Sequence, residues 1–460
     1  MKNFTISFYF YHLCQTLTDA PGKLSVDDDK IWNNLDLFCE KNWLLPEGQN
    51  LRSYLNYDEK TKALKTTGKS GWLTKTSSPI DFEKSDVVED WHREGNLLPF
   101  RLQDTYFADL TYSAQPSDID LQPSQLQQFP IDQLLSDNIN PSLGQTIGIY
   151  GEVEKGDRYC QEIADEYVAA VLENSKHAEP ILLNCGSLFG SLLYEYEAAH
   201  REYPNKTAKK CHLLVLINNG EANTVELAQK SYEWLRDLLC CRHKISLVYQ
   251  QSRETYLQCR KLYGELEKEI GNFSKKVSTP EGRLEYLKEL LKDSPLKYLN
   301  YTSCLRDLKA HQTAIETNTK NYQICLEKMA EIGEIPESWQ EFIDRCELWQ
   351  TQIKTDLNYL SPGQDLFDRV VNTARSMAEI DRAESDRSLE RTIQMLGAGL
   401  GSGAIAASAI ASHVQTPVTL KPGYPIHPAA STLLWSIFFG LFGWGIAWLC
   451  IGGWSSLKNK

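Results

Sequence analysis

The first part of the chain carries apolar patterns that are typical of β-strands. Residues 1–145 are irregular, with strand-like patterns at 6–13 and within 98–114. The stretch 115–141 is rich in Pro, Gln, Ser and Asp, which indicates a linker or a long loop. We therefore assign 1–145 as a β-rich N-terminal region.

Strand and helix patterns alternate in residues 146–250, as expected for an α/β sheet domain. Residues 211–217 form an almost continuous apolar run, which predicts a strand that is buried on both faces. The other predicted strands are 146–150, 180–183 and 245–249, and the predicted helices are 159–172 and 223–239.

Beyond residue 251 the apolar spacing is almost wholly helical, which predicts a helical stalk at 251–391 and favours coiled-coil packing. The successive helix candidates are 253–277, 280–292, 295–332 and 336–360. No Pro occurs between Pro362 and Pro417, so the simplest prediction is one helix from about Gly363 into the tail. About fifty helical residues would extend about 75 Å.

The tail, residues 392–460, contains two stretches without a formal charge, 392–413 and 432–454. About 20 apolar helical residues cross a bilayer core of about 30 Å. Several prolines separate the two stretches, so the tail predicts a transmembrane hairpin of two helices. The predicted fold class is therefore α+β: an N-terminal α/β soluble domain, a long helical stalk and a C-terminal transmembrane hairpin.

Positive charges predict the orientation of this hairpin. Lys421 is the only basic residue between the two spans, whereas basic residues flank the hairpin on both sides. These flanking residues are Arg382, Arg387, Arg391, Lys458 and Lys460. Because positive charge marks cytoplasmic flanks, we expect both termini and the soluble body to be cytoplasmic.

The first predicted span is rich in small residues, with Gly397 and Gly401 four apart, and Gly399 and Gly403 likewise. This spacing lets helix backbones approach closely in lipid. The predicted contact is either with the second span or with copies of the same chain, which would give a homo-oligomer. A further alternative is that this segment is an interfacial or buried helix. Trp435, Trp448 and Trp454 are predicted interface anchors.

The charge balance excludes some partners. The 460 residues contain 48 Lys and Arg against 61 Asp and Glu, a net charge of −13. An acidic chain is a poor general binder of nucleic acid, which requires a basic face. Residues 392–460 carry only three charged residues, all lysines, so the acidic excess lies in the preceding body. The predicted partners are the lipid bilayer, further copies of the chain and an unknown cytoplasmic ligand.

Motifs that carry chemistry are scarce. Residues 151–157, Gly-Glu-Val-Glu-Lys-Gly-Asp, resemble a phosphate loop but lack Lys and Ser or Thr after the second Gly. Residues 184–187, Asn-Cys-Gly-Ser, lack the context of a nucleophile elbow. His413 and His427 flank the loop between the spans, and the twelve cysteines show no zinc-binding spacing. We therefore predict no enzyme activity, no cofactor and no metal.

One basic cluster is a candidate anion site. Arg242, His243 and Lys244 form a basic segment in an acidic protein. The alternative is that they end the helix preceding a turn, where cations favour the helix dipole.

Two segments resemble a known family. Residues 232–236 (Tyr-Glu-Trp-Leu-Arg) with 241–245 (Cys-Arg-His-Lys-Ile), and residues 379–389 before the Gly-rich span, resemble an uncharacterised family of cyanobacterial-type two-span membrane proteins. The topology is also similar to the CorA magnesium-channel class. However, the Gly-Met-Asn signature of that class is replaced here by residues 411–414, Ala-Ser-His-Val.

The leading hypothesis is a non-enzymatic, oligomeric membrane-anchored protein. Its cytoplasmic domain would sense or bind a partner and couple through a long helix to the hairpin. The alternatives are a CorA-like ion channel or transporter and a membrane-tethered nucleotide-binding effector.

Overall fold

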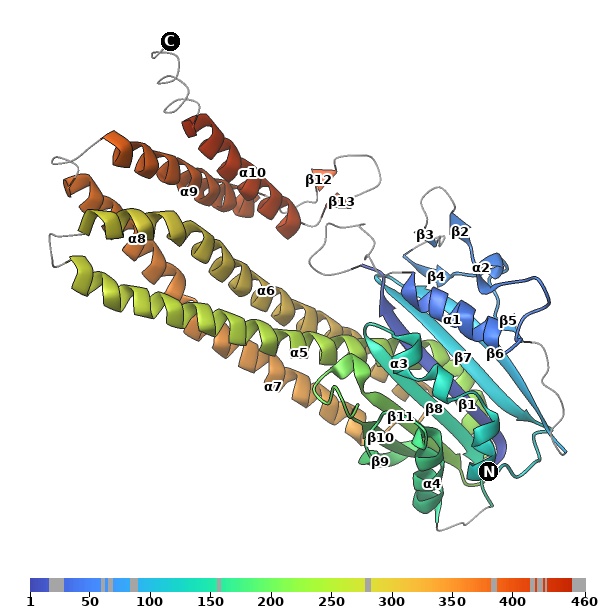
Figure 1. The fold of residues 1–460 in the computed structure, drawn as a ribbon. Coiled ribbons are helices and arrows are strands. Elements are labelled where there is room, and N and C mark those ends of the chain that lie inside the picture. Colours follow the sequence, from blue (N-terminus) through green and yellow to red (C-terminus); the bar gives the residue numbers. More distant parts are fainter. Residues whose placement is uncertain are drawn as a thin grey trace. The chain divides into compact units, whose positions relative to one another are not determined.

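The computed structural model has a mixed α+β fold with an N-terminal sheet and long helices (Figure 1). It describes residues 1–15, 29–58, 63–64, 69–82, 90–154, 159–277, 283–381, 387–413, 418–419, 425–426 and 428–448. The chain forms two compact units. Unit 1 contains residues 1–16, 24–250 and 313–350, and unit 2 contains residues 17–23, 251–312 and 351–460.

Within the described residues, unit 1 is built on one nine-stranded sheet of order β4-β6-β7-β1-β8-β11-β10-β9, with β5 paired to β6. Its strands are β1 (Lys2–Leu13), β4 (Ser70–Trp72), β5 (Ile80–Asp81), β6 (His92–Leu102), β7 (Thr105–Gln115), β8 (Gly144–Glu152), β9 (Ile181–Leu188), β10 (Ser191–Ala198) and β11 (Cys211–Asn218). The strand predictions at 6–13, 98–114, 146–150, 180–183 and 211–217 are confirmed.

Strand β1 joins the two halves of this sheet. It pairs antiparallel with both β7 and β8, and β8 pairs parallel with β11. Residues on both sides of position 145 therefore belong to one sheet. A separate pair consists of β2 (Tyr57–Asp58) and β3 (Ala63–Leu64).

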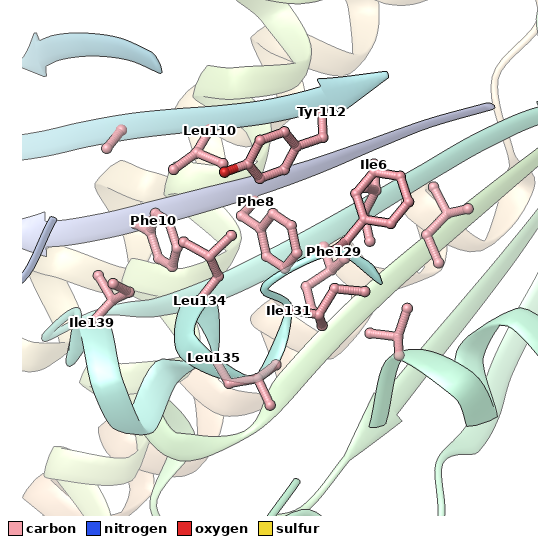
Figure 2. Packing of buried hydrophobic residues seen from close by; sticks show 14 of the residues in the cluster. Ile6, Phe8, Phe10, Leu110, Tyr112, Phe129, Ile131, Leu134, Leu135 and Ile139 are labelled. Carbon is pink, nitrogen blue, oxygen red and sulfur yellow. The ribbon is translucent and has the colours of Figure 1, made fainter. Parts of the chain in front are cut away.

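One face of the sheet carries the main apolar core. Phe8 of β1 lies opposite Leu110 and Ile147, and all three are fully buried. Figure 2 shows Ile6, Phe8 and Phe10 directed towards the segment that contains Phe129, Ile131, Leu134, Leu135 and Ile139. The helices whose residues join this core are α1 (Lys30–Lys41), α2 (Leu51–Tyr54), η1 (Pro123–Gln128), η2 (Asp132–Leu134), α3 (Ser136–Ile139) and α4 (Cys160–Leu172).

Of the two predictions for 115–141, the linker is therefore wrong, whereas a long loop with short helical turns connects β7 to β8. Leu121, Leu126, Phe129 and Leu134 are buried at 4% exposure or less, so the segment is part of the core. Its prolines and polar residues form short 3₁₀ turns, which place an apolar side chain towards the sheet every few residues.

Three long helices each contribute residues to both units: α5 (Thr224–Val277), α6 (Arg283–Ile332) and α7 (Glu337–Leu360). The predicted end of a helix near 239 and the strand at 245–249 are wrong, because α5 runs through both. Ile245 and Val248 are buried at helical spacing, and Tyr249 stacks on Trp349 with ring centroids 4.3 Å apart. Tertiary packing here overrides the local strand preference of a β-branched segment. Helix α6 likewise continues through Pro295.

The predicted single helix from Gly363 into the tail is also wrong. The chain forms α8 (Pro362–Asp381) and α9 (Arg387–His413) instead. A Cβ on Gly397 would lie 3.6 Å from the guanidinium carbon of Arg375, and Ile393 shares an apolar cluster with Ala374 and Ala378. In a straight helix, residues 375 and 397 would be about 33 Å apart. Helices α8 and α9 therefore lie side by side.

The last described elements follow α9. They are the paired strands β12 (Val418–Thr419) and β13 (Pro425–Ile426) and the helix α10 (Pro428–Trp448).

Candidate functional sites: the C-terminal hairpin and the polar face of the sheet

Helices α9 and α10 pack through small residues. A Cβ on Gly399 would lie 3.8 Å from the carbonyl oxygen of Gly440, and one on Gly403 would lie 3.7 Å from that of Ser436. A Cβ on Gly443 would overlap Ser402. Two of the four predicted packing glycines, Gly399 and Gly403, thus allow the two helices of this hairpin to approach closely.

The other two glycines of α9 lie elsewhere. Gly397 faces Arg375 of α8, and a Cβ on Gly401 would meet no described atom within 4 Å. Packing between copies of the chain stays a prediction for this helix.

The rest of the α10 surface is apolar and exposed. Its large apolar side chains are between 38% and 66% exposed. They are Leu433, Leu434, Trp435, Ile437, Phe438, Phe439, Leu441, Phe442, Trp444 and Ile446. With 3.6 residues per turn, these positions surround about two thirds of the helix, and the small stripe that faces α9 completes it.

This exposed aromatic surface contains one of the three predicted interface anchors. Trp435 is 44% exposed and stacks on Phe439 with ring centroids 5.5 Å apart. Trp454 and the side chain of Trp448 lie outside the described residues. Among the described residues, no helix combines the length and the apolarity needed to cross a membrane.

A second candidate site lies where the first half of α5 contacts the sheet. Alternate residues of β1 and its neighbours place polar side chains on this face, opposite to the apolar core. Tyr232 of α5 donates a hydrogen bond to Asp109 of β7 (2.5 Å), and Tyr11 of β1 donates one to the carbonyl of Arg236 (3.1 Å). Helix α5 is therefore held by directional polar contacts at several strands.

The candidate anion-binding residues belong to this contact. Arg242, His243 and Lys244 lie in the middle of α5, so their predicted location at a helix end is wrong. Arg242 pairs with Glu195 of β10 (2.6 Å), and Lys244 pairs with Asp104 between β6 and β7 (2.5 Å). Both cations are thus already neutralised by carboxylates, and an anion would have to displace those partners.

Four residues form a continuous hydrogen-bonded chain beneath α5. Nε2 of His243 lies 2.8 Å from Oγ1 of Thr146, and the same oxygen lies 3.0 Å from Nδ1 of His212. Nε2 of His212 lies 3.0 Å from Oε1 of Glu195. These hydrogen bonds therefore connect α5 with β8, β11 and β10.

Burial and neighbouring charges fix the ionisation of Glu195, His212 and His243. Burial would raise the pKa of Glu195, but Arg242 and then the hydrogen bond with His212 outweigh burial and hold the pKa at about 2. Burial, followed by the charge of Arg242, lowers the pKa of His212. Burial, followed by His212 and Arg242, holds the pKa of His243 well below its ordinary value. At neutral pH the carboxylate is ionised and both imidazoles are neutral.

The order of carboxylate, imidazole and hydroxyl in Glu195, His212 and Thr146 is that of a hydrolase triad. However, Thr146 is 0% exposed, so its hydroxyl cannot meet a substrate in this conformation. The arrangement is a structural chain rather than a nucleophile.

Asp109 is a further buried carboxyl group on this face. It accepts hydrogen bonds from Tyr232 (2.5 Å) and Thr111 (2.8 Å). Burial raises the pKa of Asp109 to about 6, although both hydrogen bonds act to lower it.

The remaining sequence motifs contribute little to either site. Gly151 and Glu152 of the phosphate-loop motif are in β8, where Gly151 packs against Met1, and residues 155–157 lie outside the described residues. Residues 184–187 are in the edge strand β9. His413 ends α9, and His427 lies outside the described part of the chain. No group of three or more metal-ligating side chains occurs among the described residues.

Sequence reasoning missed Thr146, His212, Glu195 and Asp109. A usable signal was present, since His212 is the one polar side chain in the apolar run 211–217. A polar residue in a strand that is buried on both faces requires a hydrogen-bond partner. The partner itself is supplied by a strand far away in the sequence.

No family model matches the chain, and no curated protein and no solved structure matches it either.

Proposed function

We propose that this protein is anchored to a membrane by its C-terminal hairpin, α9–α10, and binds a cytoplasmic partner through its sheet-containing body. The observation that carries the proposal is the set of exposed large apolar side chains that surround about two thirds of α10. Exposed apolar patches of this kind mark lipid or protein contacts. Lipid is favoured because, among the described residues, α10 packs on α9 through a small-residue seam, which is typical of helices in a bilayer.

The long helices supply the proposed connection to the body. Helix α5 begins on the sheet of unit 1 and continues without interruption into unit 2. A change in how α5 binds the sheet would therefore reach the unit that carries the hairpin. The basic residues that flank the hairpin favour a body on the cytoplasmic side.

The test is flotation of the full chain with liposomes of neutral phospholipid. We expect wild type to float and the double variant Phe438→Asp/Phe442→Asp to remain at the bottom of the gradient. A matched control, Leu257→Asp/Leu348→Asp, places two charges at exposed apolar positions of α5 and α7. Equal flotation of the α10 variant and wild type would refute the proposal.

Self-association is a second element of the proposal. The double variant Gly399→Leu/Gly403→Leu would separate α9 from α10, whereas Gly401→Leu has open space around it. If cross-linking of detergent-solubilised chains gives dimers or larger species, loss of those species in Gly401→Leu alone would place the contact between copies on the opposite side of α9.

A further inference from the structure

The hydrogen bonds beneath α5 have a single direction at neutral pH. Ionised Glu195 can only accept, so Nε2 of His212 donates to it. Neutral His212 then has a bare Nδ1, which accepts from the hydroxyl of Thr146. The Thr146 oxygen in turn accepts from Nε2 of His243. Each donor in this series of hydrogen bonds has one acceptor.

An added proton breaks this order at His212, because it would go to Nδ1 and meet the hydroxyl proton of Thr146. On His243 it would go to Nδ1, which lies where a side chain on Gly144 would be, 2.7 Å from the position of its Cβ. His243 is only 7% exposed, so the added charge would be largely cut off from water. Gly144 has a φ of +135°, so its backbone conformation and its lack of a side chain both suit the close approach of the imidazole.

We propose that Glu195, His212, Thr146 and His243 form a proton-operated latch, which holds α5 on the sheet when both imidazoles are neutral and releases it at mildly acidic pH. This is a regulatory device of unit 1. Only its effect on the membrane hairpin rests on the function proposed above.

The surroundings of the two imidazoles oppose a second positive charge. Arg242 of α5 lies close to both imidazoles, and its guanidinium is 4.9 Å above the ring of Phe342 from α7. The ring of Tyr11 from β1 lies 5.1 Å from that of His243. The titratable and charged groups that face the latch are Glu195 and Glu197 of β10, Tyr11 of β1, Arg242 of α5, Tyr322 of α6 and Cys346 of α7.

The carboxylates do not reverse this conclusion. Glu195 attracts a proton on His212, but its charge is already shared with Arg242. Glu197 pairs with Lys210 at 2.6 Å. Asp109 lies elsewhere on the same face and titrates with the opposite effect on stability, because its burial favours the protonated form. A variant that removes Asp109 therefore isolates the histidine contribution.

Hydrogen exchange of the detergent-solubilised full chain, followed by mass spectrometry at pH 7.5 and pH 5.5, tests the latch. Rates are corrected for the intrinsic pH dependence of amide exchange. One proton taken up on opening changes the opening equilibrium by up to about tenfold per pH unit. We expect amides of residues 232–249 to open at least about tenfold more at pH 5.5 in wild type.

The key variant is His243→Gln, which keeps a donor to Thr146 and cannot take up a proton. We expect its acid-induced opening to be several-fold smaller than that of wild type, because only His212 is left to take up a proton. The matched control is His92→Gln, since His92 is on β6 and pairs with Glu94 rather than with the latch; it should open like wild type. Opening of wild-type strength in His243→Gln would overturn the proposal, as would the absence of opening in wild type.

A second measurement covers the case in which His243→Gln does not fold. Nuclear magnetic resonance of histidine-labelled wild type should show His212 and His243 neutral at pH 7.5 and protonated together with the opening of α5. Protonation that leaves the exchange of residues 232–249 unchanged would refute the latch. Flotation with liposomes is scored separately, so failure of the anchor and failure of the latch are distinguishable.

Discussion

The two faces of the unit 1 sheet are built in opposite ways, although the same strands supply both. Even-numbered residues of β1, such as Phe8, enter the apolar core, whereas Tyr9 and Tyr11 lie on the face that binds α5. The apolar face is stabilised by removing surface from water, which needs no defined partner and no defined protonation state. The polar face also buries Phe107 and, from α5, Ile245, but it adds hydrogen bonds and charges, which fix one arrangement and make it conditional on pH.

The largest effect should come from the apolar face. Phe8→Ala removes a fully buried ring from between Leu110 and Ile147 and leaves a cavity. We expect a loss of about 3–5 kcal/mol in the free energy of unfolding, equal at pH 7.5 and pH 5.5. Exchange of the slowest β1 amides in the full chain measures it. A loss that changes with pH would remove the distinction between the two faces.

A smaller loss is expected from the ion pair on the polar face. Glu195→Ala leaves Arg242 and His212 without their buried acceptor, which should cost about 3 kcal/mol. Glu197→Ala is the matched control on the same strand, because its pair with Lys210 is about a third exposed. It should cost less than about 1 kcal/mol in the same exchange experiment. Equal losses would show that burial does not determine how much these ion pairs contribute to the free energy of unfolding.

The hydroxyl of Thr146 should contribute less again. Thr146→Val keeps the shape of the side chain but leaves two imidazole nitrogens without a partner. We expect a loss of about 1–2 kcal/mol, read from the exchange of α5 amides at residues 232–249. A neutral substitution would mean that the histidines find other partners.

The smallest effect concerns the pH dependence of the polar face. The pKa of Asp109 is raised from 3.8 to about 6, so the native state binds this proton first and its stability increases as pH falls from about 6 to 3.8. The two histidines act in the opposite sense, because their lowered pKa values make the unfolded state bind protons first below about pH 6.5.

Asp109→Asn removes the opposing contribution. Acidification from pH 7 to pH 5.5 should therefore destabilise this variant more than wild type, by about 1 kcal/mol. The comparison is made by exchange of the sheet amides at both pH values. A shallower dependence in the variant would contradict the assignment of Asp109.

Much of the fold followed from local patterns. The apolar run at 211–217 predicted a strand buried on both faces, and β11 is buried along almost its whole length between β8 and β10. The linker prediction for 115–141 was wrong because its many turn-forming and polar residues are typical of an exposed linker. The leucines and the phenylalanine spaced among them are the side chains that pack in the core. Helix α5 misled in another way, since the strand-like residues 245–249 gain more by packing on α7 and the sheet than they lose in propensity.

The candidate sites divide along the same line. The apolar tail and its glycine spacing were visible in the sequence, and the structure adds that Gly399 and Gly403 face Gly440 and Ser436 of the same chain. The hydrogen-bonded chain beneath α5 was not visible, because His212 and His243 are 66 and 97 residues away from Thr146 in the sequence. They meet it only through the pairing of β8 with β11 and the packing of α5 on the sheet.

The sequence by itself determined which segments are apolar, where most of the long strands of the sheet lie and that the last part of the chain is almost free of charge. These properties depend on the order of residues within a few turns or strand lengths. The tertiary structure alone decided which polar groups meet beneath α5, that α8 and α9 lie side by side, and which face of α10 is covered. Those outcomes depend on contacts between distant segments, where partners set burial, hydrogen bonding and pKa.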